Sequence, residues 1–210
     1  MLSRPTIPAG KPFAIEVGGD RAAIYNTRML GKDDVVFTGR HRVYFRNCTI
    51  SGSTDFNFGQ GSAVYDRCTI VAQPGKFWSF ITAHAGNTSA APGNGTAPAT
   101  AYLIQDSRLP LIGSQRLGTT YLGRPWGAMA HVVYKNTWMD KHISALGWSS
   151  GRGMPTANLT YAEFNSTGPG ANPSKRAKFS TQLTSAEAAE WTVERVLQGW
   201  LPPTAPPAAL

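Results

Sequence analysis

Two aspartates occupy equivalent places after two copies of a short repeated phrase. Asp34 lies eight residues after Asn26, and Asp55 lies eight residues after Asn47. If the two copies stack as successive coils, the carboxylates lie one above the other. Closely paired carboxylates cannot easily both be charged, so one is favoured as an acid and the other as a nucleophile or base. The alternative is a pair of solvated aspartates in turns, where this residue type is common.

The residues around Asp55 favour a cleft over open solvent. Residues 50–59 place Asp55 between glycines and next to two aromatic residues, Phe56 and Phe58. Such a setting is unusual for a carboxylate that faces bulk water. It indicates a lined cleft with a carboxylate inside.

The repeated phrase predicts the elements that position these residues. It occurs in residues 25–29, 45–50, 65–70, 104–109 and 134–139. Each copy alternates apolar and polar residues and is followed by turn-forming residues, which is typical of a short strand. Such strands cannot each bury a face alone, but parallel stacking at a period of about 20 residues buries a continuous column.

We therefore predict an all-β protein, a right-handed parallel β-helix. A sandwich or barrel is the competing fold, and its hairpins should contain Asn-Gly or Asp-Gly turns between strands. Asn94-Gly95 lies instead in a long polar segment.

Cys48 and Cys68 hold the same position in consecutive copies of the phrase, so this fold places their backbones about 4.8 Å apart. They are expected as stacked thiols, with a disulfide as the alternative and a metal site disfavoured because only two ligands are visible.

The C-terminal residues change to a helical pattern. Thr184 and Glu187 form a capping box, followed by good helix formers through Gln198 and a stop at Gly199. One amphipathic helix is predicted to pack outside the solenoid through Trp191, Val196 and Leu197. We expect one domain over residues 1–201 and a disordered proline-rich tail over residues 202–210.

Charge and processing signals indicate the kind of partner. The 210 residues carry a net charge of +8, which favours a polyanion such as nucleic acid or an acidic polysaccharide. The basic residues are scattered singly, so a merely solvated positive surface stays open. No segment resembles a membrane span or a signal peptide. Four glycosylation acceptors, which favour secretion, are Asn87, Asn94, Asn158 and Asn165.

Several motifs resemble the pectin methylesterases of carbohydrate esterase family 8. Residues 50–59 are similar to the family's signature around its nucleophilic aspartate, with Asn57 departing from an aliphatic residue, and residues 121–126 (YLGRPW) match the family hexapeptide. The resemblance continues through residues 146–148 and 161–170 and covers Phe13 to Leu201. The chain would begin inside the family's solenoid, without its N-terminal coils and helical cap.

The resemblance implies roles for these residues. Asp55 would attack the methyl ester of a galacturonate unit, and Asp34 would protonate the departing methanol and then activate water. Arg124 would orient Asp55, and no metal or cofactor is required. The substrate-binding residues implied or suggested are Phe58, Trp126, Trp148, Lys11 and Asp33, with His84 as a further cleft-lining residue. For the two tryptophans, packing in the core is the alternative to stacking on sugar rings.

Two positions break the family pattern. The glutamines that stabilise the oxyanion are replaced by Lys11 and Asp33, and Asp33 would repel a developing negative charge. We hypothesise that these residues form an ion pair in which the Lys11 ammonium serves as electrophile. The alternative is a catalytically impaired β-helix that only binds pectin. A lyase or glycosidase acting on polygalacturonate is a third hypothesis.

The resemblance implies a pectinesterase of the cell wall, and the glycosylation acceptors agree with a secreted protein. Its expected partner is pectin (homogalacturonan), without nucleic acid or membrane, and the expected state is a monomer.

Overall fold

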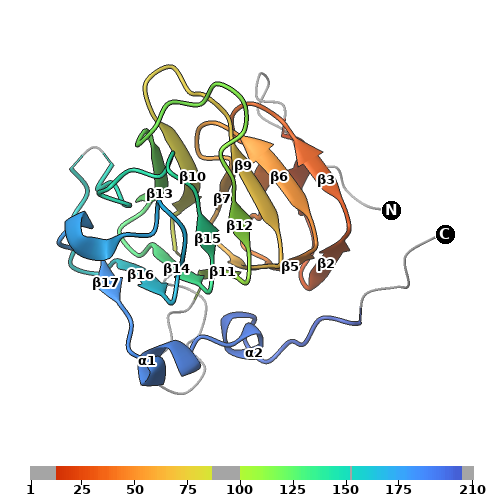
Figure 1. Ribbon diagram of the computed structural model, residues 1–210. Helices are drawn as coiled ribbons and strands as arrows, with labels where there is room; N and C mark the ends of the chain where they lie inside the picture. The colour runs from red at the N-terminus through yellow and green to blue at the C-terminus, as the bar shows by residue number, and fades with distance from the viewer. Residues whose placement is uncertain (1–12, 87–99, 152, 205–210) are drawn as a thin grey trace.

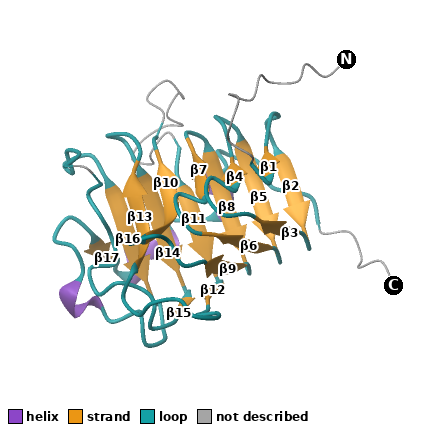
Figure 2. Ribbon diagram, turned by 90° about the horizontal axis from the view of Figure 1, so that it is seen from above, coloured by secondary structure: helices purple, strands orange, loops and turns teal. Residues whose placement is uncertain are grey.

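The computed structural model describes residues 13–86, 100–151 and 153–204, which wind into stacked parallel coils (Figures 1 and 2). Each coil contributes strands to sheets that run along the solenoid, and each strand pairs in parallel with those of neighbouring coils. The fold is the predicted right-handed parallel β-helix.

The strands fall into three sheets, in which neighbouring strands come from neighbouring coils. Sheet A contains β1 (Ile15–Glu16), β4 (Val36–Phe37), β7 (Asn57–Gly59), β10 (Ser79–His84) and β13 (Thr120–Pro125). Sheet B contains β17 (Thr181–Gln182), β16 (Thr160–Phe164), β14 (His131–Lys135), β11 (Tyr102–Gln105), β8 (Ser62–Asp66), β5 (Arg42–Arg46) and β2 (Ala22–Tyr25). Sheet C contains β15 (Trp138–Met139), β12 (Arg108–Leu109), β9 (Thr69–Ala72), β6 (Thr49–Gly52) and β3 (Arg28–Leu30).

The repeated phrase sets the register of the coils. Phe45 of β5 pairs with Tyr65 of β8, and their rings stack at 4.9 Å. Ile50 of β6 pairs with Met29 on one side and Ile70 on the other, and all three are buried. Because strand side chains alternate between faces, the same positions of every coil fill one apolar column inside the solenoid.

A polar residue recurs where sheet B turns into sheet C. These residues have positive φ angles of 49–53°, a conformation that asparagine and aspartate tolerate better than other non-glycine residues. They are Asn26, Asn47, Arg67, Asp106, Asn136 and Asn165. Asn47 donates to Asn26 at 2.7 Å, and Asn165 donates to Asn136 at 3.0 Å. The turn therefore explains why the phrase carries a polar residue at this place.

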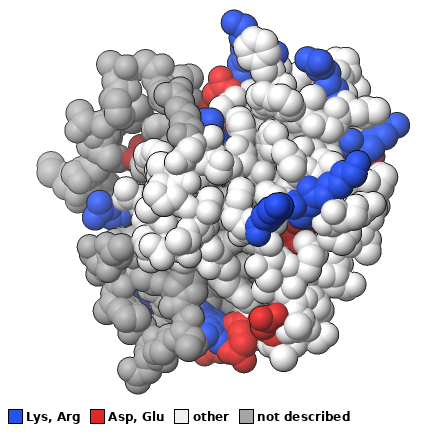
Figure 3. Space-filling model, turned by 90° about the vertical axis from the view of Figure 1, so that its left-hand side faces the viewer, with Lys and Arg blue, Asp and Glu red and all other residues white. Residues whose placement is uncertain are grey.

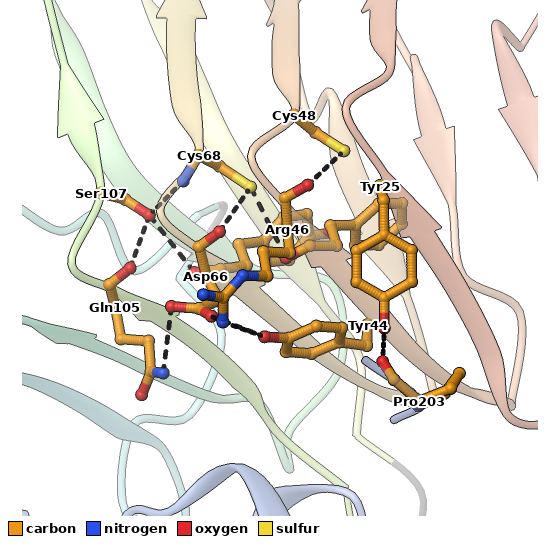
Figure 4. A network of polar contacts seen from close by, with 11 residues as sticks. Tyr25, Tyr44, Arg46, Cys48, Asp66, Cys68, Gln105, Ser107 and Pro203 are labelled. Carbon is orange, nitrogen blue, oxygen red and sulfur yellow. Dashed lines mark hydrogen bonds and ion pairs between the residues drawn. The ribbon is translucent and has the colours of Figure 1, made fainter. Parts of the chain in front are cut away.

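Cys48 and Cys68 follow these turns on adjacent coils (Figure 4). Both are free thiols and are 1% exposed. Their Sγ atoms lie against backbone carbonyl groups, Cys48 against Arg46 at 3.4 Å and Cys68 against Asp66 at 3.5 Å. The expected stacked thiols are what the structure contains.

The C-terminal segment forms two short helices, so the prediction of one helix was wrong. α1 (Ser185–Ala189) begins with the predicted capping box of Thr184 and Glu187. α2 (Val193–Val196) begins at a second cap, where the Thr192 hydroxyl accepts from the N–H of Arg195 at 3.1 Å. Thr192 is a better N-cap than interior helix residue, and capping there ends continuity with α1. A 3₁₀ turn, η1 (Pro173–Lys175), precedes both helices.

This segment covers the outer face of sheet B and runs back toward the first coils (Figure 1). Val196 and Leu197 pack there on apolar residues of β8 and β11, as predicted, with Trp191 beside them. The Tyr25 hydroxyl donates to the carbonyl oxygen of Pro203 (Figure 4). Pro203 is thus held against β2, whereas disorder was expected from residue 202 onward; residues 205–210 lie outside the described part.

On the face shown in Figure 3, lysine, arginine and acidic side chains are dispersed among uncharged residues. Within the described residues, no helix has the length and apolarity needed to cross a membrane.

Candidate active site

Asp34 and Asp55 occupy equivalent turns on adjacent coils, as the repeat predicted. Their φ angles are 52° and 51°, so both lie in the left-handed region. Asp33 and Thr54 form a parallel bridge, and the Asp34 N–H donates to the carbonyl oxygen of Thr54 at 3.1 Å. Both aspartates line one cleft of about 690 Å³, which Arg124 of β13 in sheet A also lines.

Arg124 reaches Asp55 from a coil further along the solenoid. It lies in β13, where it pairs with Ala83 of β10, and Ala83 pairs in turn with Phe58 of β7. Its Nε donates to one oxygen of the Asp55 carboxylate at 2.8 Å, and its Nη2 donates to the other at 2.5 Å. This bidentate geometry fixes the carboxylate in one orientation.

Burial and charge act in opposite directions on Asp55. Its side chain is 19% exposed, and burial raises the pKa of its carboxyl above the ordinary value. The Arg124 guanidinium lowers this pKa, whereas the carboxylates of Asp34 and Asp33 raise it further. Asp55 therefore lies near two other carboxylates and one close cation, a crowding of charges that is typical of a functional carboxylate.

Asp55 and Arg124 separate two hollows. The larger cleft extends toward the first coils and includes Leu30 and Lys32. The smaller hollow, about 220 Å³, includes Trp126. A chain-like ligand that filled both hollows would cross directly over the Asp55 carboxylate.

Trp126 offers the exposed apolar face that was expected of it. Its side chain is 51% exposed, and its ring meets Phe58 edge-on at 5.9 Å. Phe58 is only 9% exposed and stacks on Phe37 at 4.9 Å. Phe58 thus supports Trp126 from below and offers little surface of its own.

Two residues predicted to line the cleft are buried instead. Trp148 is 1% exposed, stacks on Tyr161 at 4.5 Å and donates through Nε1 to Glu163 at 3.1 Å, so it belongs to the core. His84 is fully buried against Tyr102. Its Nδ1 accepts from the backbone N–H of His131 at 2.9 Å, so the ring proton lies on Nε2, which donates to the carbonyl oxygen of Gly61. Burial lowers the pKa of His84 to about 3.

Asp33 acts as an acceptor where a neutral donor was expected. One carboxylate oxygen accepts from the Ser53 hydroxyl at 2.6 Å and from the Thr54 N–H at 3.2 Å. Lys11 lies outside the described residues, so its predicted ion pair with Asp33 stays a prediction. In the described part of the chain, Asp33 is held by neighbours of Asp55.

Sequence reasoning missed an aromatic row beside Arg124. The Arg124 guanidinium lies over the Phe80 ring at 4.2 Å, Phe80 stacks on Tyr121 at 5.4 Å, and Tyr121 meets Trp78 at 5.8 Å. The sequence does contain a signal for this row, because three of the four residues in Phe77–Phe80 are aromatic, just before and at the start of β10.

No group of three or more His, Cys, Asp or Glu within the described residues is arranged to hold a metal.

Fold and site together define a parallel β-helix protein with a carboxylate pair and an arginine in a cleft on one sheet. Comparison with known proteins makes this more specific. The Pectinesterase family model matches residues 8–200, so the chain belongs to the Pectinesterase family.

Individual relatives support this membership. "Pectinesterase 31" of Arabidopsis thaliana is 34% identical over 181 residues, covering 86% of this chain and 53% of the relative. "Probable pectinesterase/pectinesterase inhibitor 58" of the same plant is 32% identical over 201 residues, covering 92% of this chain and 35% of the relative. The chain thus spans between about a third and about half of these curated relatives.

Solved structures of the same kind share the fold. Pectin methylesterase from carrot superposes with a TM-score of 0.77 at 29% identity, covering 88% of this chain and 59% of that one. A pectin methylesterase solved in complex with a hexasaccharide has a TM-score of 0.70 at 28% identity, covering 90% and 60%.

Proposed function

We propose that this chain hydrolyses methyl esters of pectin and releases methanol. The observation that carries the proposal is the bidentate contact of Arg124 with Asp55, 2.8 and 2.5 Å long, in a cleft that Asp34 shares. Family membership supports the reaction class, and the hexasaccharide bound to a structural relative supports a polysaccharide substrate.

The proposed mechanism gives each carboxylate a different step. An oxygen of ionised Asp55 attacks the ester carbonyl carbon and forms an acyl-enzyme as the methoxy group leaves. Asp34, protonated at the start, gives its proton to the departing methanol oxygen. It then takes a proton from water, which hydrolyses the acyl-enzyme and frees Asp55. Arg124 holds Asp55 so that a fixed oxygen faces the ester.

The oxyanion that forms when Asp55 attacks the ester needs a hydrogen-bond donor or a positive charge nearby. Asp33 accepts hydrogen bonds from Ser53 and Thr54 and has no proton to give when ionised. We retain the hypothesis that Lys11 supplies the positive charge, which predicts loss of turnover in Lys11→Ala. Unchanged turnover in that variant would remove Lys11 from the mechanism.

A second candidate function follows from the same observation. A carboxylate at residue 33 favours a pectin-binding homologue with impaired catalysis, because loss of one oxyanion donor can cost roughly 10²- to 10³-fold in rate. Asp33→Gln should then raise turnover. Under the first candidate, with Lys11 as electrophile, the same change should lower it.

One experiment tests the main proposal. Methanol release from methyl-esterified polygalacturonate is measured for the parent chain and for Asp55→Asn, with circular dichroism to confirm folding. Release by the parent and none above background by Asp55→Asn is expected. Equal release by both would refute the nucleophile, and tight pectin binding without release would favour the second candidate.

We also propose a secreted, cell-wall location and a monomeric state. Asn158 and Asn165, two of the glycosylation acceptors, are exposed, which supports passage through the secretory route. Mass shifts after glycosidase treatment and size-exclusion chromatography check these two points.

A further inference from the structure

A row of aromatic side chains leads away from the candidate nucleophile. It starts at Arg124, which holds Asp55, and continues through Phe80 and Tyr121 to Trp78. Phe80 and Tyr121 are partners in the pairing of β10 with β13. Tyr121 precedes Arg124 by three residues of one strand, so the row extends about 10 Å toward the N-terminal ends of β10 and β13.

The far end of this row is open to solvent. Trp78 is 49% exposed and its neighbour Phe77 is 64% exposed. Exposed aromatic residues beside a cleft indicate a binding site, because large apolar patches on the surface of soluble proteins are uncommon and mark places where ligands or partners bind. Neither residue is needed by the proposed ester chemistry.

The segment that carries Trp78 is fixed in place. The Ser79 hydroxyl is buried, donates to the carbonyl oxygen of Gln73 at 2.7 Å and accepts from the Gly75 N–H at 3.2 Å. A Cβ on Gly75 would lie 2.3 Å from the carbonyl oxygen of Trp78, so only glycine fits this turn. A surface fixed before binding loses little conformational entropy when a ligand arrives.

The same segment is tied to the rim of the cleft. Gln73 donates through Nε2 to the carbonyl oxygen of Gly31 at 2.8 Å and to the Ser51 hydroxyl at 2.9 Å. Gly31 lines the cleft that holds Asp34 and Asp55. The segment that carries Trp78 is therefore fixed to the rim of the cleft, and Arg124 belongs both to the cleft and to the aromatic row.

The chemistry of the row matches a polyuronide. Flat aromatic faces suit the apolar C–H faces of sugar rings, and the Lys76 ammonium lies 5.5 Å from the centre of the Phe77 ring. A cation beside exposed aromatic rings complements a polymer whose units each combine a sugar ring with a carboxylate. A neutral glucan would make no use of Lys76.

We propose that Trp78, Tyr121 and Phe80, with Lys76 beside them, form a binding surface for galacturonate units beyond the one that reacts at Asp55. The substrate class rests on the function proposed above. The surface would select long pectin chains over short ones and would favour demethylated units, whose carboxylates are free to meet Lys76.

Binding of demethylated oligogalacturonates tests this proposal, because these products undergo no turnover. Dissociation constants are measured by calorimetry for short oligomers, which fill only the cleft, and for long oligomers, which extend past it. In Trp78→Ala, binding of the long oligomers should weaken about 3- to 10-fold while the short ones bind unchanged. Trp78→Phe, which keeps an aromatic face, should recover most of the difference.

Trp138→Ala is the matched control. Trp138 also lies beside a cation, with the Arg108 guanidinium 4.8 Å from its ring, but it belongs to β15 of sheet C. The control should leave the length dependence unchanged. Parent-like affinity for long oligomers in Trp78→Ala and in the Phe77→Ala/Trp78→Ala double variant would overturn the proposal, as would an equal loss for short and long oligomers.

Methanol release by the parent separates the two proposals. If the parent releases no methanol but Trp78→Ala loses affinity for long oligomers, the ester chemistry fails and the binding surface stands. If the parent releases methanol and the affinity is unchanged, the reverse holds.

Discussion

Arg124 and Asp55 are 69 residues apart, yet both nitrogens of the guanidinium edge meet both oxygens of the carboxylate. Three successive coils bring them together. Arg124 belongs to β13, Asp55 lies two residues before β7, and β10 lies between these two strands in sheet A. The pair is only partly buried, with 29% and 19% of the side chains exposed, so a ligand could reach the carboxylate without breaking the fold.

Arg124→Lys should lower kcat about 10- to 100-fold, because lysine keeps the charge but cannot hold two oxygens at once. Methanol release under saturating pectin measures this. Arg42→Lys is the matched control, since Arg42 also contacts both carboxylate oxygens of Asp20, on sheet B. If Arg124→Lys kept full activity, orientation by the guanidinium would not matter.

Asp33→Asn should move the acidic limb of the pH profile to lower pH. The proposed nucleophile must be ionised, so activity is expected to fall as the pH drops through the pKa of Asp55, which lies above the ordinary value. The Asp33 carboxylate is one cause of that elevation, and its removal lets Asp55 ionise at lower pH. The pH dependence of kcat/KM measures the shift.

Asp106→Asn serves as control for the Asp33 variant. Asp106 lies at the turn between sheets B and C, where it accepts from Asn136 at 3.0 Å, and it does not line the cleft of Asp55. Its substitution should leave the profile in place. A shift of the acidic limb upward in Asp33→Asn would contradict the assigned electrostatics.

Trp126 and Trp148 should respond differently to substitution. Trp126→Ala removes a half-exposed ring and is expected to raise KM about 3- to 10-fold with little loss of stability. Trp148→Phe removes the buried hydrogen bond to Glu163 and should lower the free energy of unfolding by about 1–2 kcal/mol without changing KM. Urea unfolding and pectin kinetics on both variants check this; a raised KM in folded Trp148→Phe would reverse the assignment.

Leu197→Ala should destabilise the chain by about 2–5 kcal/mol, because Leu197 is fully buried between the C-terminal segment and sheet B. Leu201→Ala is its matched control, since Leu201 is 62% exposed and should change stability by less than about 0.5 kcal/mol. Urea midpoints compare the two. Equal midpoints would mean that the segment contributes little to the fold.

The sequence alone determined which residues occupy equivalent positions on successive coils. Short strands that alternate apolar and polar residues define which side chains enter the column, and equal distance from Asn26 and Asn47 therefore placed Asp34 and Asp55 in equivalent turns without reference to the tertiary structure. The capping box at Thr184 was equally local and was correctly predicted. These features depend on neighbours in the chain or on one repeat period.

Only the tertiary structure decided which side chains line the cleft. Trp148 and His84 turned inward, Asp33 was held by Ser53 and Thr54, and Phe80 and Trp78 lined up with Arg124. Their positions depend on packing between coils, where residues far apart in sequence compete for the same space. The repeat period fixes where each residue's backbone lies along the coil. It does not determine which side chains pack inside and which line the cleft, because that depends on the side chains of the surrounding coils.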